Sequence, residues 1–296
     1  MRNFIYKNSN RSGIGDRLFD LMLVYTYCKY LKCDKLYLHW DENNSVTIGN
    51  GESIYSKLRI EKTPFRFKDY LLKNLIKYIN LPEDIVFVNK SELNDLCNDD
   101  NNIVFTEYIG ISYNLYSFLP RISNENWKLF EKLYFDNFSK ISFKNIPENI
   151  VDFFKNNKVI TVHLRRGDKV CNDKGKSNNI ELNELDKLNQ LTEKAIFELN
   201  NDNAYKLCFI SDENSIKYEY FKNFKDKLDS YIFEGNEISQ TYIDLFCLVN
   251  SEKIIMSQKF SVFSIFSSMI KQNKLYCLIN QGKIREFNKY KNIILT

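Results

Sequence analysis

Two adjacent arginines show the clearest potential for chemistry in this sequence. They follow residues 159–164, an apolar run rich in β-branched side chains that predicts a buried strand and contains His163. In a parallel α/β sheet, ligands bind just beyond the carboxyl ends of the strands. Because successive side chains of an extended segment point to opposite sides, only one of Arg165 and Arg166 can face a given ligand. A guanidinium presents a rigid fork of donors that matches phosphate oxygens, so we expect a phosphate group beside Arg165.

A purely structural interpretation of the same stretch stays open. Gly167 would let the backbone turn sharply after the strand, and Asp168 could then close an ion pair with Arg166. Such a turn would need no ligand, so these residues alone do not decide between a binding role and a structural role.

Residues 163–168 read H-L-R-R-G-D, which resembles the H-x-R-R-x-D motif of the α1,2-, α1,6- and protein O-fucosyltransferases. Lys169 and Asp173 extend the resemblance toward the α1,6 branch. The resemblance implies an α/β fold of the GT-B type, with two Rossmann-like domains facing a cleft. It also implies an inverting transfer of fucose from GDP-fucose to a glycan hydroxyl, without a metal or other cofactor.

Composition narrows the class of protein further. A chain of 296 residues can form one large or two medium domains. With 42 basic and 38 acidic residues, the charge is too balanced for a nucleic-acid binder. The seven cysteines form no C-x-x-C pair and are interpreted as reduced core residues. Because no apolar stretch approaches the ~20 residues of a membrane helix, we expect a cytoplasmic protein with no transmembrane segment.

A glycine-containing loop precedes the first long helix that the sequence predicts. Gly13 and Gly15 bracket a tight turn after the strand-like residues 4–6, and residues 18–31 are apolar nearly all round. Such a loop can bring backbone N–H groups and a helix N-terminus to a diphosphate, although a simple turn into a core helix explains it equally. The segment resembles the opening of the nodulation α1,6-fucosyltransferases, so the resemblance implies that both glycines bind the nucleotide sugar.

The whole chain alternates predicted strands and helices. In the first half we expect strands at 36–40, 85–88 and 103–105, and helices at 70–79 and 127–135. In the second half we expect strands at 159–164, 207–211, 231–233, 253–256 and 275–279, and helices at 182–199, 215–227, 239–250 and 261–271. Repeated βα units favour a parallel, doubly wound sheet. We therefore predict an N-terminal α/β domain on the acceptor side (residues 1–145) and a C-terminal Rossmann-like domain for the nucleotide sugar (residues 146–296).

Asp244 is an isolated carboxylate on one of these predicted helices. Its neighbours Ile243 and Leu245 are apolar, and a buried carboxylate without a partner is costly. In the family that the chain resembles, a helical aspartate at this place accepts hydrogen bonds from the edge of guanine. The structural alternative is a salt bridge to Lys253 or a capping role.

Two more strand ends carry polar residues. Residues 259–261 read K-F-S and resemble the family's S-F-S segment, which implies that Phe260 and Ser261 contact the nucleotide. Ser261 would add a hydroxyl to a helix N-terminus that can bind phosphate, or it could simply cap that helix. For Ser211 and Asp212, at the end of another strand, we expect one of the two to cap the following helix.

The resemblance also implies individual roles. Arg165 would stabilise the leaving phosphate, and Asp173 would accept the proton of the acceptor hydroxyl. His163 and Arg166 would line the nucleotide site, and Lys169 would lie with Asp173 on the acceptor side. One alternative is a GT-B enzyme that uses another nucleotide sugar. The other is an adhesive module, because residues 166–168 form an RGD tripeptide.

Overall fold

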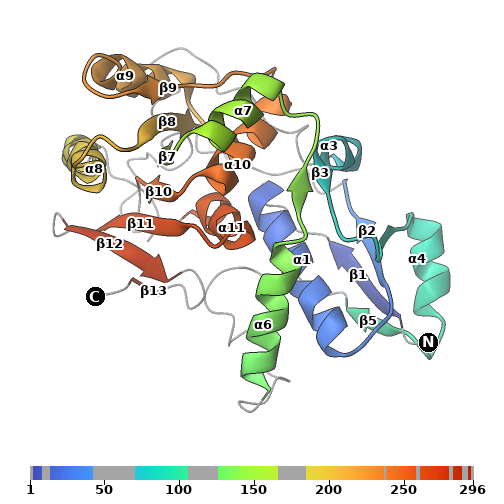
Figure 1. Ribbon diagram of the computed structural model, residues 1–296. Coiled ribbons are helices and arrows are strands. Elements are labelled where there is room, and N and C mark those ends of the chain that lie inside the picture. The colour runs from blue at the N-terminus through green and yellow to red at the C-terminus, as the bar shows by residue number, and fades with distance from the viewer. Residues whose placement is uncertain are drawn as a thin grey trace. The chain divides into compact units, whose positions relative to one another are not determined.

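The computed structural model (Figure 1) describes residues 3–8, 14–42, 71–105, 126–165, 185–236, 238–257, 261–279, 283–288 and 293–294. Its fold is α/β, as the alternation of elements predicts. The contacts between Cα atoms divide the chain into two compact units, and among the described residues the first ends at Asn145 and the second begins at Ile146. Each unit has its own main sheet, parallel throughout in the first unit and mostly parallel in the second.

The sheet of the first unit has four parallel strands in the order β4-β2-β1-β5. The strands are β1 (Phe4–Asn8), β2 (Leu36–Trp40), β4 (Ile85–Phe87) and β5 (Ile103–Phe105). The described helices of this unit are α1 (Ile14–Tyr30), α3 (Leu72–Tyr78), α4 (Lys90–Cys97) and α6 (Trp127–Phe138). Two short segments, β3 (Ile79–Asn80) and β6 (Ser142–Phe143), pair antiparallel. Neither of these short strands was predicted.

Helix α1 is the core element of the first unit. It is buried on nearly all sides because it lies between the sheet and α6, where Phe19 makes edge contacts with Tyr134 and Phe138. The helix ends where Lys32 adopts a positive φ of 58° and Cys33 N–H donates to Cys28 O at 3.0 Å, as in a Schellman motif. No helix in the described part of the chain has the length and apolar character needed to cross a membrane.

The second unit has a seven-stranded sheet in the order β13-β12-β11-β10-β7-β8-β9. Five strands are parallel, namely β7 (Val159–Leu164), β8 (Lys206–Ser211), β9 (Ser230–Tyr231), β10 (Lys253–Met256) and β11 (Lys274–Ile279). The last two, β12 (Lys283–Asn288) and β13 (Ile293–Ile294), each pair antiparallel with the strand before them and extend the predicted parallel sheet at one edge. The described helices are α7 (Glu148–Asn156), α8 (Leu185–Leu199), α9 (Asn214–Phe224), α10 (Ser239–Asn250) and α11 (Val262–Ile270).

Strand β7 is an interior strand of this sheet, between β10 and β8, and is buried along its whole length. Ile160, Val162 and Leu164 share an apolar core with residues of α8 and α9. The side chains of the alternate residues make hydrogen bonds to helices. Thr161 bonds to α10 and to the residue that follows it, and His163 bonds to α11. Since the chain leaves β7 toward β8 and returns later to β10 on the other side, the strand order reverses between β7 and β10. Such a switch point is where ligands bind in doubly wound sheets.

Candidate functional site

The candidate site begins where β7 and β10 end side by side. Their parallel pairing runs to Met256 and His163, and one further hydrogen bond, from Ser257 N–H to His163 O at 3.1 Å, continues it. Beyond β10 the described chain resumes at Ser261, which is the N-cap residue of α11. The carboxyl end of β7 and the N-terminus of α11 therefore lie at the same edge of the sheet.

His163 joins the end of β7 to the first turn of α11. Its Nδ1 lies 2.7 Å from Ser264 Oγ, and its ring centroid is 5.8 Å from that of Phe263. The side chain is buried, so most of its surface contacts protein atoms. These contacts fix α11 relative to β7, and they orient the N-terminus of that helix over the strand ends.

Arg165 follows β7 and pairs with the carboxylate that follows β8. Its Nε lies 3.9 Å from Asp212 Oδ2, and the two side chains are 30% and 21% exposed. A pair this accessible adds little to stability, but it holds the guanidinium at the edge of the sheet. The side chain of Arg165 is therefore oriented by Asp212 and is still accessible to solvent.

This pair corrects the prediction that Ser211 or Asp212 caps the next helix. The N-cap residue of α9 is Glu213, and it makes no side-chain cap. Ser211 Oγ instead donates to Leu164 O at 2.5 Å and accepts from Glu213 N–H at 3.0 Å. The hydroxyl thus ties the ends of β7 and β8 together, and the carboxylate of Asp212 is directed to Arg165.

Ser261 occupies the N-cap position of α11, but its hydroxyl does not cap the helix. The residue is extended, with φ −145° and ψ 114°, and makes no side-chain bond to the first turn. It is only 3% exposed, and within the described chain its Oγ has no hydrogen-bond partner. A buried hydroxyl without a partner is costly, and the N-terminus of a helix attracts negative charge. The arrangement is therefore suited to an anion that accepts from this hydroxyl.

Asp244 lies on α10 and is 3% exposed. Gln240, one turn earlier, donates from Nε2 to Asp244 Oδ1 at 2.7 Å. The suggested salt bridge to Lys253 is wrong, because Lys253 Nζ donates to Leu199 O at 2.9 Å and lies 3.9 Å from the ring centroid of Tyr205. Capping is also excluded, since Asp244 is inside the helix. The carboxylate therefore belongs to a local polar cluster on α10.

In the first unit, Gly15 does not bracket a loop as predicted, because α1 already begins at Ile14. Gly15 is buried in the first turn of the helix, where Asp16 complements the helix dipole. Arg17 has an anchoring role that the sequence did not indicate. Its buried guanidinium donates from Nη1 to Asp41 O at 3.0 Å and lies 5.3 Å from the ring centroid of Trp40. Arg17 thereby fixes the start of α1 to the end of β2.

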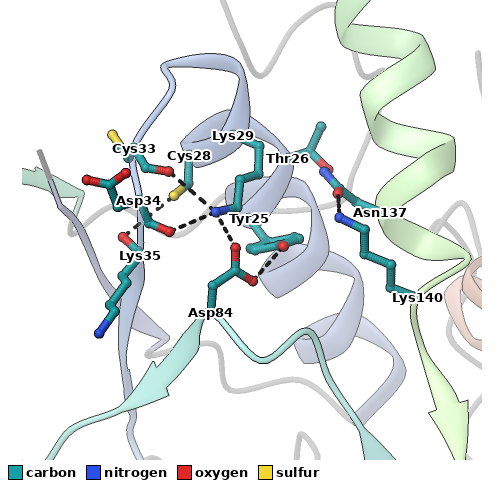
Figure 2. Close-up of polar contacts among 10 residues, drawn as sticks. All are labelled: Tyr25, Thr26, Cys28, Lys29, Cys33, Asp34, Lys35, Asp84, Asn137 and Lys140. Carbon is teal, nitrogen blue, oxygen red and sulfur yellow. Dashed lines mark hydrogen bonds and ion pairs between the residues drawn. The ribbon is translucent and has the colours of Figure 1, made fainter. Parts of the chain in front are cut away.

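A second polar cluster of the first unit lies at the other end of α1 (Figure 2). Tyr25 donates to Asp84 Oδ1 at 2.7 Å, and the ammonium of Lys29 pairs with Asp84 Oδ2. Lys29 also donates to Asp34 O at 2.9 Å. Burial and then the nearby carboxylate raise the pKa of Tyr25. Burial also raises the pKa of the Cys28 thiol, to about 12, which favours its neutral form.

Five of the predicted site residues lie outside the described residues: Gly13, Arg166, Lys169, Asp173 and Phe260. Of the others, His163, Arg165 and Ser261 lie at or next to the switch point of the second sheet. Asp244 lies on the neighbouring helix α10, which packs against α11. Gly15 belongs to the first unit. In the described parts of the chain, no group of three His, Cys, Asp or Glu side chains is placed to hold a metal ion.

Comparison with known proteins identifies the fold. No protein-family model matches the sequence, and no curated protein is significantly similar to it. Among solved structures, NodZ α-1,6-fucosyltransferase co-crystallized with GDP matches with a TM-score of 0.53 and 15% identity, over 97% of this chain and 98% of that chain. Fucosyltransferase NodZ from Bradyrhizobium matches with a TM-score of 0.51 and 14% identity, with the same coverage of both chains. The protein therefore has the GT-B fold of the NodZ fucosyltransferases, as the resemblance of its arginine motif implied.

Proposed function

We propose that the protein is an inverting, metal-independent glycosyltransferase that moves fucose from GDP-fucose to a hydroxyl group of a glycan. The observation that carries this proposal is the edge of the second sheet, where Arg165 follows β7 and the Ser261 hydroxyl, which has no partner among the described residues, precedes α11. Two NodZ structures of the same fold, one co-crystallized with GDP and one soaked with GDP-fucose, support this choice of donor.

The pyrophosphate of the donor would bind at this edge. When the bond between the sugar and GDP breaks, negative charge develops on the β-phosphate, and a positioned donor that meets this charge lowers the barrier. Arg165 offers two N–H groups in one plane, and its pairing with Asp212 sets the direction of its side chain. Ser261 Oγ and the first N–H groups of α11 would donate to the same phosphates. These groups would supply the charge stabilisation that a divalent cation provides in other transferases.

The guanine base would be recognised by Asp244. A carboxylate can accept from both N1–H and the 2-amino group of guanine, a pair of donors that uracil does not have. The carboxylate is buried on α10, where Gln240 donates to its Oδ1, and the ammonium of Lys253 is directed to Leu199 O instead. Gly13 and Gly15 would contribute backbone N–H groups to the donor from the first unit.

On the acceptor side, we propose that Asp173 is the general base. The acceptor oxygen would attack C1 of fucose from the face opposite GDP, the bond from C1 to the phosphate oxygen would break, and Asp173 would take the hydroxyl proton. Lys169 would lie beside the acceptor, and Arg166 would line the nucleotide site together with His163. The first domain would bind the acceptor.

The test is a donor series with a panel of acceptor glycans. We expect GDP-fucose to be consumed faster than GDP-mannose or any UDP-sugar, with an added chelator leaving the rate unchanged. The glycan product should carry fucose with an inverted anomeric configuration. A preference for a UDP-sugar would favour the alternative of a GT-B transferase with another donor, and would remove the proposed role of Asp244.

A further inference from the structure

Gln240 makes three side-chain hydrogen bonds around the buried carboxylate of Asp244. Its Nε2 donates to Asp244 Oδ1 at 2.7 Å and to Phe233 O at 3.1 Å. Its Oε1 accepts from Gly235 N–H at 2.8 Å. A backbone N–H can only donate and a backbone C=O can only accept, so these contacts determine which way the amide points. The amide therefore presents its N–H group, and not its oxygen, to Asp244 Oδ1.

The loop that Gln240 binds approaches α10 very closely. A Cβ atom on Gly235 would lie 2.4 Å from Ser239 Oγ and 2.7 Å from Ile243 Cδ1, so only glycine fits there without movement. Asn236 Oδ1 accepts from Ser239 N–H at 2.8 Å and secures the loop to the start of the helix. The side chain of Gln240 is thus held by its bonds to Phe233 and Gly235, and its donor to Asp244 is held with it.

We propose that Gln240 is a positioning residue for base recognition, which orients the Asp244 carboxylate so that it accepts from the guanine edge. This inference rests on the proposed function. A carboxylate on an isolated helix face could rotate about its side-chain torsions, whereas the bond at 2.7 Å fixes one of its oxygens. Binding then costs less, because the acceptor is already oriented when the base arrives.

The experiment compares GDP with inosine diphosphate, which keeps N1–H but lacks the 2-amino group. Calorimetric titration of the wild-type protein should show GDP binding about tenfold tighter or more, since one charge-assisted hydrogen bond is lost in the analogue. In Gln240→Met, which keeps the length of the side chain but none of its hydrogen bonds, this ratio should fall about threefold or more, toward unity. Inorganic diphosphate should bind both proteins equally.

Gln240→Glu is the second variant, because it keeps the acceptor for Gly235 N–H but cannot donate to Asp244. We expect at least the same fall in the ratio, since two carboxylates would then adjoin. The matched control is Asn200→Leu. Asn200 also holds a loop through its amide, donating to Tyr205 O at 3.0 Å and accepting from Tyr205 N–H at 3.0 Å, before the amino end of β8. This variant should lower Tm and leave the ratio unchanged.

The outcomes separate the two proposals. A GDP preference that survives both substitutions at Gln240 overturns the positioning role and leaves the proposed function intact. A wild-type protein that binds UDP as tightly as GDP overturns the proposed function, and the positioning role with it. If Asn200→Leu reduced the ratio as much as Gln240→Met, loss of stability alone would explain the effect, and the inference would be wrong.

Discussion

The polar clusters of the two units differ in how their members are satisfied. In the first unit, Tyr25 and Lys29 both bond to Asp84 at the end of α1, and Lys29 also donates to the backbone carbonyl of Asp34 (Figure 2). In the second unit, Ser261 Oγ is buried at the N-terminus of α11 with no partner among the residues that the structure describes. Both clusters contain charged or hydroxyl groups that a sequence motif search would treat alike.

The difference follows from their positions on the sheets. Asp84 directly precedes β4 and accepts hydrogen bonds at the amino ends of the strands. The C-terminal end of α1 is attached to the sheet at this place. Arg165 and Ser261 lie at the carboxyl ends, where ligands bind. Mutual satisfaction is therefore typical of a structural cluster, and an unpartnered buried donor at a switch point is typical of a binding site. Each prediction below could contradict this distinction or make it more precise.

Arg165→Lys should have the largest effect. Lysine keeps the charge but loses the planar fork, so kcat should fall about 10²-fold or more, as when one preorganised donor is removed. GDP affinity should fall less, and Tm should change little because the pair with Asp212 is partly exposed. Steady-state kinetics and thermal melts measure both quantities. Arg166→Lys is the matched variant and should affect mainly Tm. Equal losses of turnover in the two variants, at unchanged Tm, would show that the arginines share one role.

Asp244→Asn should have the next largest effect, on nucleotide affinity. The amide keeps the size of the side chain but loses the charge, so GDP binding should weaken by about 1.5 to 3 kcal/mol. Calorimetry with GDP measures this loss, and inorganic diphosphate is the control ligand whose affinity should not change. A folded variant that binds GDP as the wild type does would assign Asp244 to structure.

Asp84→Ala should reduce stability without changing nucleotide affinity. It removes the acceptor of Tyr25 and Lys29, which should lower the free energy of unfolding by about 1 to 2 kcal/mol. Denaturant titration measures this, with Tyr25→Phe as a smaller perturbation of the same cluster. If GDP affinity fell as well, the cluster would not be purely structural.

The same cluster predicts a pH dependence. Partial burial raises the pKa of Asp84, but hydrogen bonds from Lys29 and Tyr25 outweigh burial and hold the pKa below its ordinary value. The ionised carboxylate is therefore favoured by folding, so its contribution is complete above the unfolded pKa of about 4 and is lost as pH falls through the lower folded pKa. Denaturant titrations between pH 6 and 3, as rough limits, should show a smaller decline in Asp84→Ala than in the wild type.

Ser261→Ala should have the smallest effect, and its sign is informative. Removing an unpartnered buried hydroxyl should leave the free energy of unfolding unchanged or slightly higher, while binding of inorganic diphosphate weakens by about 0.5 to 1.5 kcal/mol. The control is Ser267→Ala on the same helix, whose Oγ donates to Phe263 O at 2.6 Å. Unlike Ser261→Ala, the control should not weaken diphosphate binding. A clear loss of stability in Ser261→Ala would contradict the binding role.

Much of the fold could be predicted from the sequence, because its regular elements follow from local patterns. The predicted bounds of β2, β5, β7, β10 and α10 coincide with the observed ones. In these segments short apolar or aromatic runs, or an apolar helix, are bounded by polar residues, and such signals need no distant partner. Helix α4 was not predicted, although Asn89 and Glu92 form a capping box at its start. Strands β12 and β13 were also missed, because their hairpin depends on pairing with β11 rather than on a strong apolar pattern.

The sequence by itself determined which residues could do chemistry, namely the arginines after a buried strand, a carboxylate on an apolar helix and a serine before another helix. Only the tertiary structure decided what each of them contacts. It paired Asp212 with Arg165, directed Lys253 away from Asp244 and left the Ser261 hydroxyl without a partner in the described chain. The physical reason is that helix and strand patterns depend on neighbours within a few residues. The partner of a side chain, in contrast, is set by which elements the sheet order brings together, and that order comes from packing the whole chain.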